Sequence, residues 1–227
     1  YYASVVLTEN AGWQRESEPV HFTLGTYADR LTDPAKEIRV VEVDPWTGMQ
    51  TEIPSQVSAV SSWSERMDDR GQPTTSFDVT FLANVPADSS KVYLIFYGNP
   101  RAKFPQYTSD LLVSGEGYGL TVENSFYKMH FQDMSGSIDE VYVKQGINKK
   151  LEHRLETNGA VQWNPDCYGP PRPWIHVSDW DPPDGYSRVD GPLFLMTNRW
   201  GQIPHYPEIN VSITYIFYAN NPYLTMI

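Results

Sequence analysis

Short strings of alternating apolar and polar residues run along almost the whole chain. No window has apolar residues at i, i+3, i+4 and i+7 without an interrupting Pro, Gly or β-branched residue. A period of two is typical of half-buried β-strands, and the missing helical period argues against long helices. Eighteen Pro and 15 Gly divide the strings into segments joined by turns. The pattern therefore predicts an all-β protein.

The strings fall into two groups separated by a stretch with little regular pattern. Residues 1–100 hold six of them, which suit a small β-barrel or sandwich. Residues 101–117 are predicted to form a linker. Residues 118–227 are predicted to form a second domain, an antiparallel β-sandwich. The predicted strands are 4–9, 19–24, 37–44, 56–63, 76–83, 91–98, 119–132 with a bend near Asn124, 137–145, 151–157, 192–201 and 208–219.

Both ends of the chain are abrupt. The sequence opens at Tyr1 with neither an initiator Met nor an apolar export signal, and it stops inside the second of two strands around an Asn-Asn-Pro turn. We expect a processed or excised piece, with the second domain truncated at its C-terminus. A removed export signal would make the protein secreted or extracellular.

The charge balance restricts the partners. Seventeen Lys and Arg oppose 28 Asp and Glu, which gives a net charge of −11. Such an acidic chain repels polyanions, so we expect neither nucleic acid nor an anionic membrane as partner. The single Cys167 cannot form an internal disulfide. Aromatic residues reach 14%, which suits surfaces for sugars or for a partner protein.

One segment breaks the strand pattern. Residues 163–192 contain seven prolines, which exclude a central strand or a helix. Indoles lie there beside carboxylates and guanidinium groups, a combination that suits a pyranose: its C–H face stacks on a ring and its hydroxyls bond to charges. We expect substrate binding by Trp163, Trp174, Trp180, Asp179, Asp181 and Arg188. The alternative is a Pro- and Trp-rich plug that closes one end of the sandwich.

The remaining motifs are weak. Zinc-protease, redox, nucleotide-binding and nucleophile-elbow signatures do not occur. We expect no cofactor, although Asp179, Asp181, Asp184 and Asp190 are close enough in sequence for an incidental Ca²⁺.

Two parts of the chain resemble a known family. The first consists of "SVVLTENAGWQRESEPVHFTL", "IRVVEVDPWTGMQTEIPSQV" and "FLANVPADSSKVYLIFYGNP". It resembles the N-terminal small barrel of exo-acting rhamnogalacturonan lyases, polysaccharide lyase family 26. The second consists of "GLTVENSFYKMHFQ", "GSIDEVYVK" and "GPLFLMTNRWG" with the strand region "VSITYIFYANNPYLTM". It resembles the galactose-mutarotase-like sandwich that follows. An α/α toroid comes next in that family, and nothing here builds one, so the resemblance implies an incomplete enzyme.

The lyase resemblance implies β-elimination at a uronate. That reaction needs a group that neutralises the carboxylate, a base for the C5 proton and an acid for the departing oxygen. As a hypothesis from this chemistry, Arg172 or Arg199 neutralises and His176 is the base. Tyr168 or Tyr186 is then the acid.

Three functions therefore remain open. The first is a secreted carbohydrate-active protein, the β-domain part of a polysaccharide lyase-like enzyme whose partner is a polysaccharide or oligosaccharide. The second is a non-catalytic glycan-binding module that uses the aromatic residues of 163–180. The third is a structural subunit of a cell-surface or extracellular filament that self-associates through its exposed C-terminal strand.

Overall fold

The computed structural model describes residues 1–61, 74–161, 169–175 and 182–227. In these ranges the chain is almost entirely β-structure, which confirms the predicted fold class. It divides into two compact units, 1–108 and 109–227. The division and the start of β8 at Leu112 both fall within the segment predicted as a linker.

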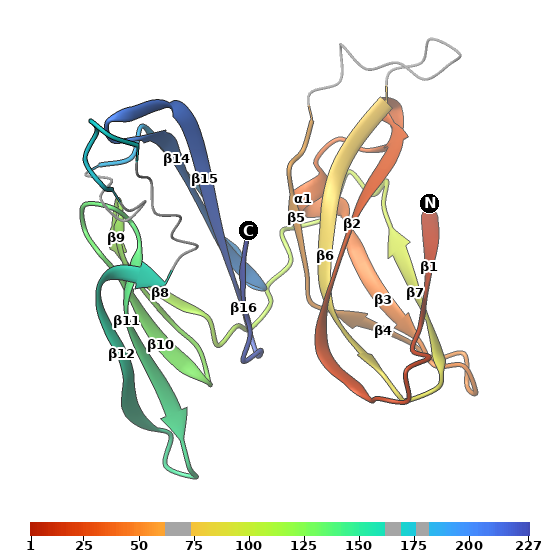
Figure 1. Ribbon diagram of the computed structural model, residues 1–227. Helices are drawn as coiled ribbons and strands as arrows, with labels where there is room; N and C mark the ends of the chain where they lie inside the picture. Colours follow the sequence, from red (N-terminus) through yellow and green to blue (C-terminus); the bar gives the residue numbers. More distant parts are fainter. Residues whose placement is uncertain (62–73, 162–168, 176–181) are drawn as a thin grey trace. The chain divides into compact units, whose positions relative to one another are not determined.

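The first unit is a sandwich of two open antiparallel sheets (Figure 1). One sheet has the order β1-β7-β3-β4 and the other the order β2-β6-β5, and the described residues close neither into a barrel. The strands are β1 (Tyr2–Thr8), β2 (Arg15–Tyr27), β3 (Arg39–Val43), β4 (Gln50–Ile53), β5 (Ser55–Ser58), β6 (Thr74–Val85) and β7 (Ser90–Phe96). A short 3₁₀ turn, η1 (Ala28–Arg30), and the one-turn helix α1 (Pro34–Glu37) connect β2 to β3.

Alternation along the strands builds the core of this unit. On β6 every second residue from Phe77 to Val85 faces inward and is buried. These side chains meet Val40 of β3 and Ile95 of β7 from the opposite sheet in one apolar cluster. The period-two pattern of the sequence is therefore what brings the two sheets together.

The second unit is also a sandwich. Its five-stranded sheet has the order β12-β11-β10-β9-β8, and its four-stranded sheet has the order β13-β14-β15-β16. The strands are β8 (Leu112–Glu116), β9 (Gly119–Glu123), β10 (Tyr127–Phe131), β11 (Ile138–Gln145), β12 (Lys150–Val161), β13 (Gly185–Val189), β14 (Phe194–Ile203), β15 (Tyr206–Tyr218) and β16 (Leu224–Met226).

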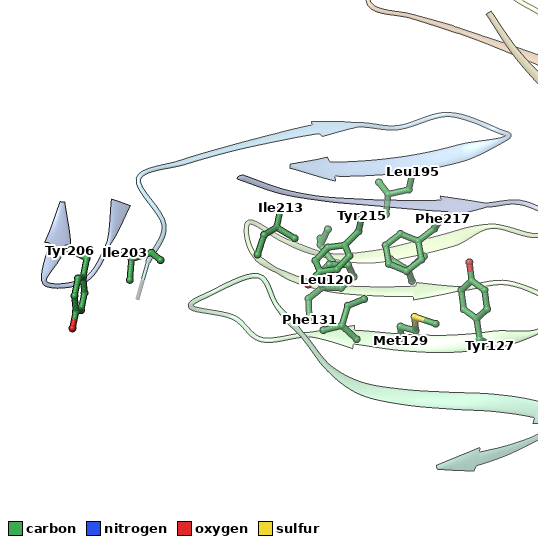
Figure 2. Packing of buried hydrophobic residues seen from close by; sticks show 12 residues of the cluster. Leu120, Tyr127, Met129, Phe131, Leu195, Ile203, Tyr206, Ile213, Tyr215 and Phe217 are labelled. Atoms are coloured by element: carbon green, nitrogen blue, oxygen red, sulfur yellow. The ribbon is translucent and has the colours of Figure 1, made fainter. Parts of the chain in front are cut away.

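Aromatic side chains fill the space between these two sheets. Figure 2 shows Phe131 from β10 against Tyr215 and Phe217 from β15. The ring centroids of Phe131 and Tyr215 are 5.7 Å apart at an angle of 81°, an edge-to-face contact. The inner faces of β9 and β10 are thereby committed to the core, and the alternate residues of the same strands form the outer face of the sheet.

Three strands were not predicted. β4 and β8 are short and lie at sheet edges, where few apolar residues are required. β13 lies inside the proline-rich segment 163–192, and it is an edge strand. An edge strand is the position in a sheet that proline-rich sequence tolerates, because one side of its backbone needs no partner.

Candidate functional site

The proline-rich segment is described in part. Of the predicted site residues, Trp163, Tyr168, His176, Asp179, Trp180 and Asp181 lie outside the described residues, so their roles stay predictions. The structure places the other five: Arg172, Trp174, Tyr186, Arg188 and Arg199.

Arg172 and Trp174 belong to a segment that is tied to β15. The Tyr206 hydroxyl donates to the Pro173 carbonyl at 2.7 Å and accepts from the Gly169 amide at 3.0 Å. The Arg172 guanidinium lies over the Tyr206 ring, 5.1 Å from its centroid, and forms an ion pair with Glu208. Trp174 is 52% exposed. This indole is therefore displayed to solvent on an anchored segment, as a sugar-binding surface requires.

Tyr186 and Arg188 lie on the edge strand β13. The Tyr186 ring packs edge-on against Tyr118, with centroids 5.2 Å apart. Its hydroxyl is buried without a hydrogen-bond partner among the described residues, and burial raises the pKa of the phenol. Arg188 donates to Asp190 from Nε at 2.8 Å. Asp184, one of the four residues considered for Ca²⁺, accepts from the Gln202 amide at 2.8 Å.

Arg199 is buried between the two sheets and is 1% exposed. Its Nη1 donates to the Ser135 carbonyl and to the Ser137 hydroxyl, both at 2.6 Å. Burial lowers the pKa of the guanidinium, although the nearby Tyr215 opposes this shift. The sheets cover the side chain in this position, which favours a structural role for Arg199. Its neutralising role stays a prediction.

A second candidate site lies on the outer face of the five-stranded sheet. The residues opposite the core on β9, β10 and β11 are polar, and together with Leu151 of β12 they surround a cavity of about 310 Å³. That volume is within the range of small-molecule sites. We call this surface the polar face; it consists of Thr121, Lys128, His130, Glu140, Tyr142 and Leu151.

His130 is held by a carboxylate. A β-bulge between β10 and β11 pairs His130 with Glu140 and Phe131 with Ile138, which leaves Asp139 as the extra residue. The Asp139 Oδ1 lies 2.8 Å from the His130 Nδ1. Because an ionised carboxylate only accepts hydrogen bonds, Nδ1 carries the proton and the neutral ring keeps a lone pair on Nε2. This is the tautomer of a general base.

Lys128 and Tyr142 face each other across β10 and β11, so their Cβ atoms are about 5 Å apart. The Tyr142 hydroxyl donates to the Glu140 Oε2 at 2.9 Å. Lys128 has no hydrogen bond or ion pair within the described parts of the chain. Glu123 is opposite Lys128 in the register of β9 and β10, and its Oε1 forms an ion pair with Lys144 at 2.6 Å. The polar face thus combines an ammonium group that forms no ion pair with the described residues, a carboxylate, an imidazole and a phenol.

The sequence analysis did not find this site. His130 lies in a predicted strand, on the side opposite Met129 and Phe131, and nothing marks it as more than a solvated residue. One signal was present: the outward positions of two successive predicted strands, 119–132 and 137–145, carry Thr121, Lys128, His130 and Tyr142. The bulge that adds Asp139 has no such signature.

Comparisons with known proteins give a fold but no family. No model of a known protein family matches the chain, and no curated protein matches it. Among solved structures, the chain is similar to a protein in the glycosyl hydrolase family 38 from Enterococcus faecalis, with a TM-score of 0.51 and 8% sequence identity. The match covers 98% of this chain and 30% of that one. This likeness shows the fold alone: the all-β arrangement also occurs in a chain of a carbohydrate-active enzyme.

The structure contains no helix among the described residues with the length and apolarity needed to span a membrane.

Proposed function

We propose that the second unit binds a uronate-containing glycan on the polar face and cleaves it by β-elimination. The observation that carries the proposal is the Lys128 ammonium, which lies in a cavity beside the His130–Asp139 pair and forms no ion pair with the described residues. Because the protein has a net charge of −11, its overall field repels anions, and a ligand carboxylate would be held only by its direct ion pair with Lys128. The fold of a glycosyl hydrolase chain and the lyase resemblance of the sequence both favour a glycan as ligand.

The chemistry distributes over three side chains. Lys128 pairs with the uronate carboxylate, which makes the adjacent C–H more acidic. His130 Nε2 removes this proton, and the electron pair left on the carbon forms a double bond while the glycosidic C–O bond breaks. The Tyr142 phenol gives its proton to the departing oxygen, and Glu140 holds that hydroxyl before the reaction. One proton moves from the sugar carbon to His130 and one from Tyr142 to the departing oxygen. The products are one sugar end with a double bond and one saturated sugar end.

Asp139 acts through His130. It fixes the ring orientation and stabilises the imidazolium that forms after proton removal. On the segment 169–175, Trp174 is proposed as a stacking surface for a further sugar ring, and Arg172 as a contact for its hydroxyls. In this scheme His130 and Tyr142 take the base and acid roles that the sequence analysis gave to His176 and to Tyr168 or Tyr186, and Lys128 takes the neutralising role.

The test separates binding from turnover. Lys128→Met should weaken binding of oligogalacturonate about 10- to 100-fold, which corresponds to the loss of one charge-assisted pair. His130→Gln should lower the rate of unsaturated-product absorbance by about 10²- to 10⁴-fold while binding changes little. Isothermal titration calorimetry measures the first effect and ultraviolet absorbance the second.

Matched controls exist in the first unit. Lys36→Met removes the same charge from an exposed ion pair with Asp33. His21→Gln removes an exposed histidine whose Nε2 lies 3.5 Å from Asp78. Both should leave uronate binding and turnover unchanged. Wild-type affinity in Lys128→Met would refute the proposed site.

A non-catalytic glycan-binding module is the second candidate. It is favoured by the exposure of Trp174, which supplies a platform that needs no acid or base. Uronate binding that depends on Lys128, without any unsaturated product from the protein, would establish the module in place of the lyase.

A further inference from the structure

Three loops meet at one end of the first unit. The register pairs Thr8, the last residue of β1, with Ser90, the first residue of β7, and it pairs Val43 of β3 with Val92. The loops 9–14, 44–49 and 86–89 therefore leave the sheet at the same end, as Figure 1 also shows. Because β7 lies between β1 and β3, the first two loops start about 10 Å apart. We call these three loops together the loop end.

The loop end displays two indoles. Trp46 is 93% exposed and Trp13 is 71% exposed, although burial of either ring would be favourable. The loop that carries Trp46 is fixed by Asp44, whose Oδ1 accepts from the Trp46 amide at 2.9 Å and the Thr47 amide at 2.7 Å. The Thr47 hydroxyl donates to the same oxygen at 2.8 Å. Trp46 is therefore held on a fixed turn, so that binding costs little ordering of the backbone.

Glu9 organises the other two loops. Its carboxylate is buried and accepts from the amides of Ala11 at 3.0 Å, Trp13 at 3.1 Å and Asp88 at 3.3 Å. The first two amides belong to loop 9–14 and the third to loop 86–89. Arg15 approaches the same carboxylate at 3.5 Å. One side chain thus holds both loops in a fixed relation.

A cavity of about 350 Å³ opens beside these loops. Its apolar lining comes from the sandwich interior and includes Leu7 and Val85. Its polar lining includes Asn10, Arg15 and Glu18. A cavity of this size, with an apolar floor and a polar rim, matches the general form of a small-molecule site.

The charges at the loop end select against an anion. Glu9, Glu18, Asp44 and Asp88 all lie on the strand ends or loops of this end, and Arg15 is the cation that lines the cavity. A uronate or an anionic lipid surface would meet more carboxylates than cations there. A neutral sugar would not be repelled, since its C–H faces stack on indoles and its hydroxyls bond to carboxylate, amide and guanidinium groups.

We propose that the loop end of the first unit is a binding site for a neutral saccharide chain. One sugar occupies the cavity beside Glu18 and Arg15, and neighbouring sugars stack on Trp13 and Trp46. This site goes beyond the function proposed for the second unit, because it lies in a different unit and takes a ligand without charge. It carries no catalytic role: the Glu9 carboxylate is occupied by backbone amides.

The experiment uses the full chain and neutral oligomers of glucose, xylose, mannose and galactose, with oligogalacturonate as the charged comparison. We expect at least one neutral oligomer to bind in calorimetry and to change tryptophan fluorescence. Trp46→Ala and Trp13→Ala should each weaken that binding about three- to tenfold, the size expected for one lost stacking contact. Trp200→Ala is the matched control, since this indole is 43% exposed on β14 of the second unit.

The outcomes are distinct from those for the polar face. Lys128→Met should leave neutral-oligomer binding unchanged, and Trp46→Ala should leave oligogalacturonate binding unchanged. Absence of binding to every neutral oligomer would overturn the proposal, as would equal affinity in Trp46→Ala and wild type. Binding to phosphatidylcholine vesicles that Trp46→Ala abolishes, without binding to any oligomer, would overturn it in favour of a membrane-contacting loop.

Discussion

Replacement of Arg199 by Met tests whether this residue is part of the structure or of the site. The substitution keeps an unbranched apolar side chain of similar length and removes the guanidinium. In the native protein that group donates to the Ser135 carbonyl and the Ser137 hydroxyl, both at 2.6 Å, and lies 3.3 Å from the Tyr215 hydroxyl. These bonds join β14 to the connection between β10 and β11, on opposite sheets of the sandwich.

The magnitude follows from two opposing effects. Two charge-assisted hydrogen bonds contribute about 1.5–3 kcal/mol each, and their loss leaves a buried carbonyl without its donor. Removal of a buried charge returns part of this free energy, because the guanidinium no longer has to be desolvated. We expect a net loss of about 2 kcal/mol in the free energy of unfolding. For a unit of this size, that lowers Tm by about 8 °C.

Urea unfolding and calorimetry measure the loss, and Arg188→Met is the control. Arg188 pairs with Asp190, whose side chain is 54% exposed. Loss of such a surface pair should change the stability by about 0.5 kcal/mol or less. The reasoning would be refuted by an Arg199→Met protein that unfolds like wild type but no longer releases unsaturated products, since the guanidinium would then act on the substrate.

Three further changes test the fold of both units. Glu9→Gln should make the free energy of unfolding fall less steeply with decreasing pH. Burial opposes ionisation of Glu9, but its hydrogen bonds to backbone amides and to Arg15 outweigh burial and lower its pKa. The stability that the Glu9 carboxylate contributes is therefore present above about pH 4.5 and is lost as pH falls through the lower pKa of the folded state. A wild-type-like acid limb in urea titrations would contradict this. Phe81→Ala should cost about 3–5 kcal/mol in urea unfolding, because this ring is fully buried between the sheets of the first unit. Gly115→Ala should cost at least about 1 kcal/mol, measured in the same way, because φ is +92° and a Cβ would lie 2.1 Å from the Gly119 carbonyl oxygen; an unchanged midpoint would show that the β8–β9 turn relaxes freely.

The strands of the sandwich cores could be predicted because the alternation of apolar and polar residues along a strand also decides which of its faces is buried. On β10, Tyr127, Met129 and Phe131 alternate with polar residues, and the structure buries these three and leaves the others toward the outer face. β4 and β8 escaped prediction for the same reason. Edge strands bury few side chains, so their sequences carry little periodic signal.

The proline-rich segment shows what composition can and cannot predict. Its prolines correctly excluded a central strand, and its one described strand lies at a sheet edge. Its charged residues were less informative. Arg172 pairs with Glu208, a residue that only the folded chain brings within reach. Arg188 pairs with Asp190, which is close to it in sequence, and the sequence does not show that this pair is formed.

The polar face could not be recognised from the sequence, because the sequence does not show whether a surface lysine forms an ion pair. Lys128 and Lys144 both alternate with apolar residues on neighbouring strands. In the folded chain, Lys144 lies 2.6 Å from the Glu123 carboxylate and 2.6 Å from the Asn124 carbonyl. Lys128 is paired in register with Glu123, yet the ion pair of that carboxylate is with Lys144. Which of the two lysines pairs with Glu123 is decided by competition across three strands, and among the described residues Lys128 is left without an ion pair, which makes it available to an anionic ligand.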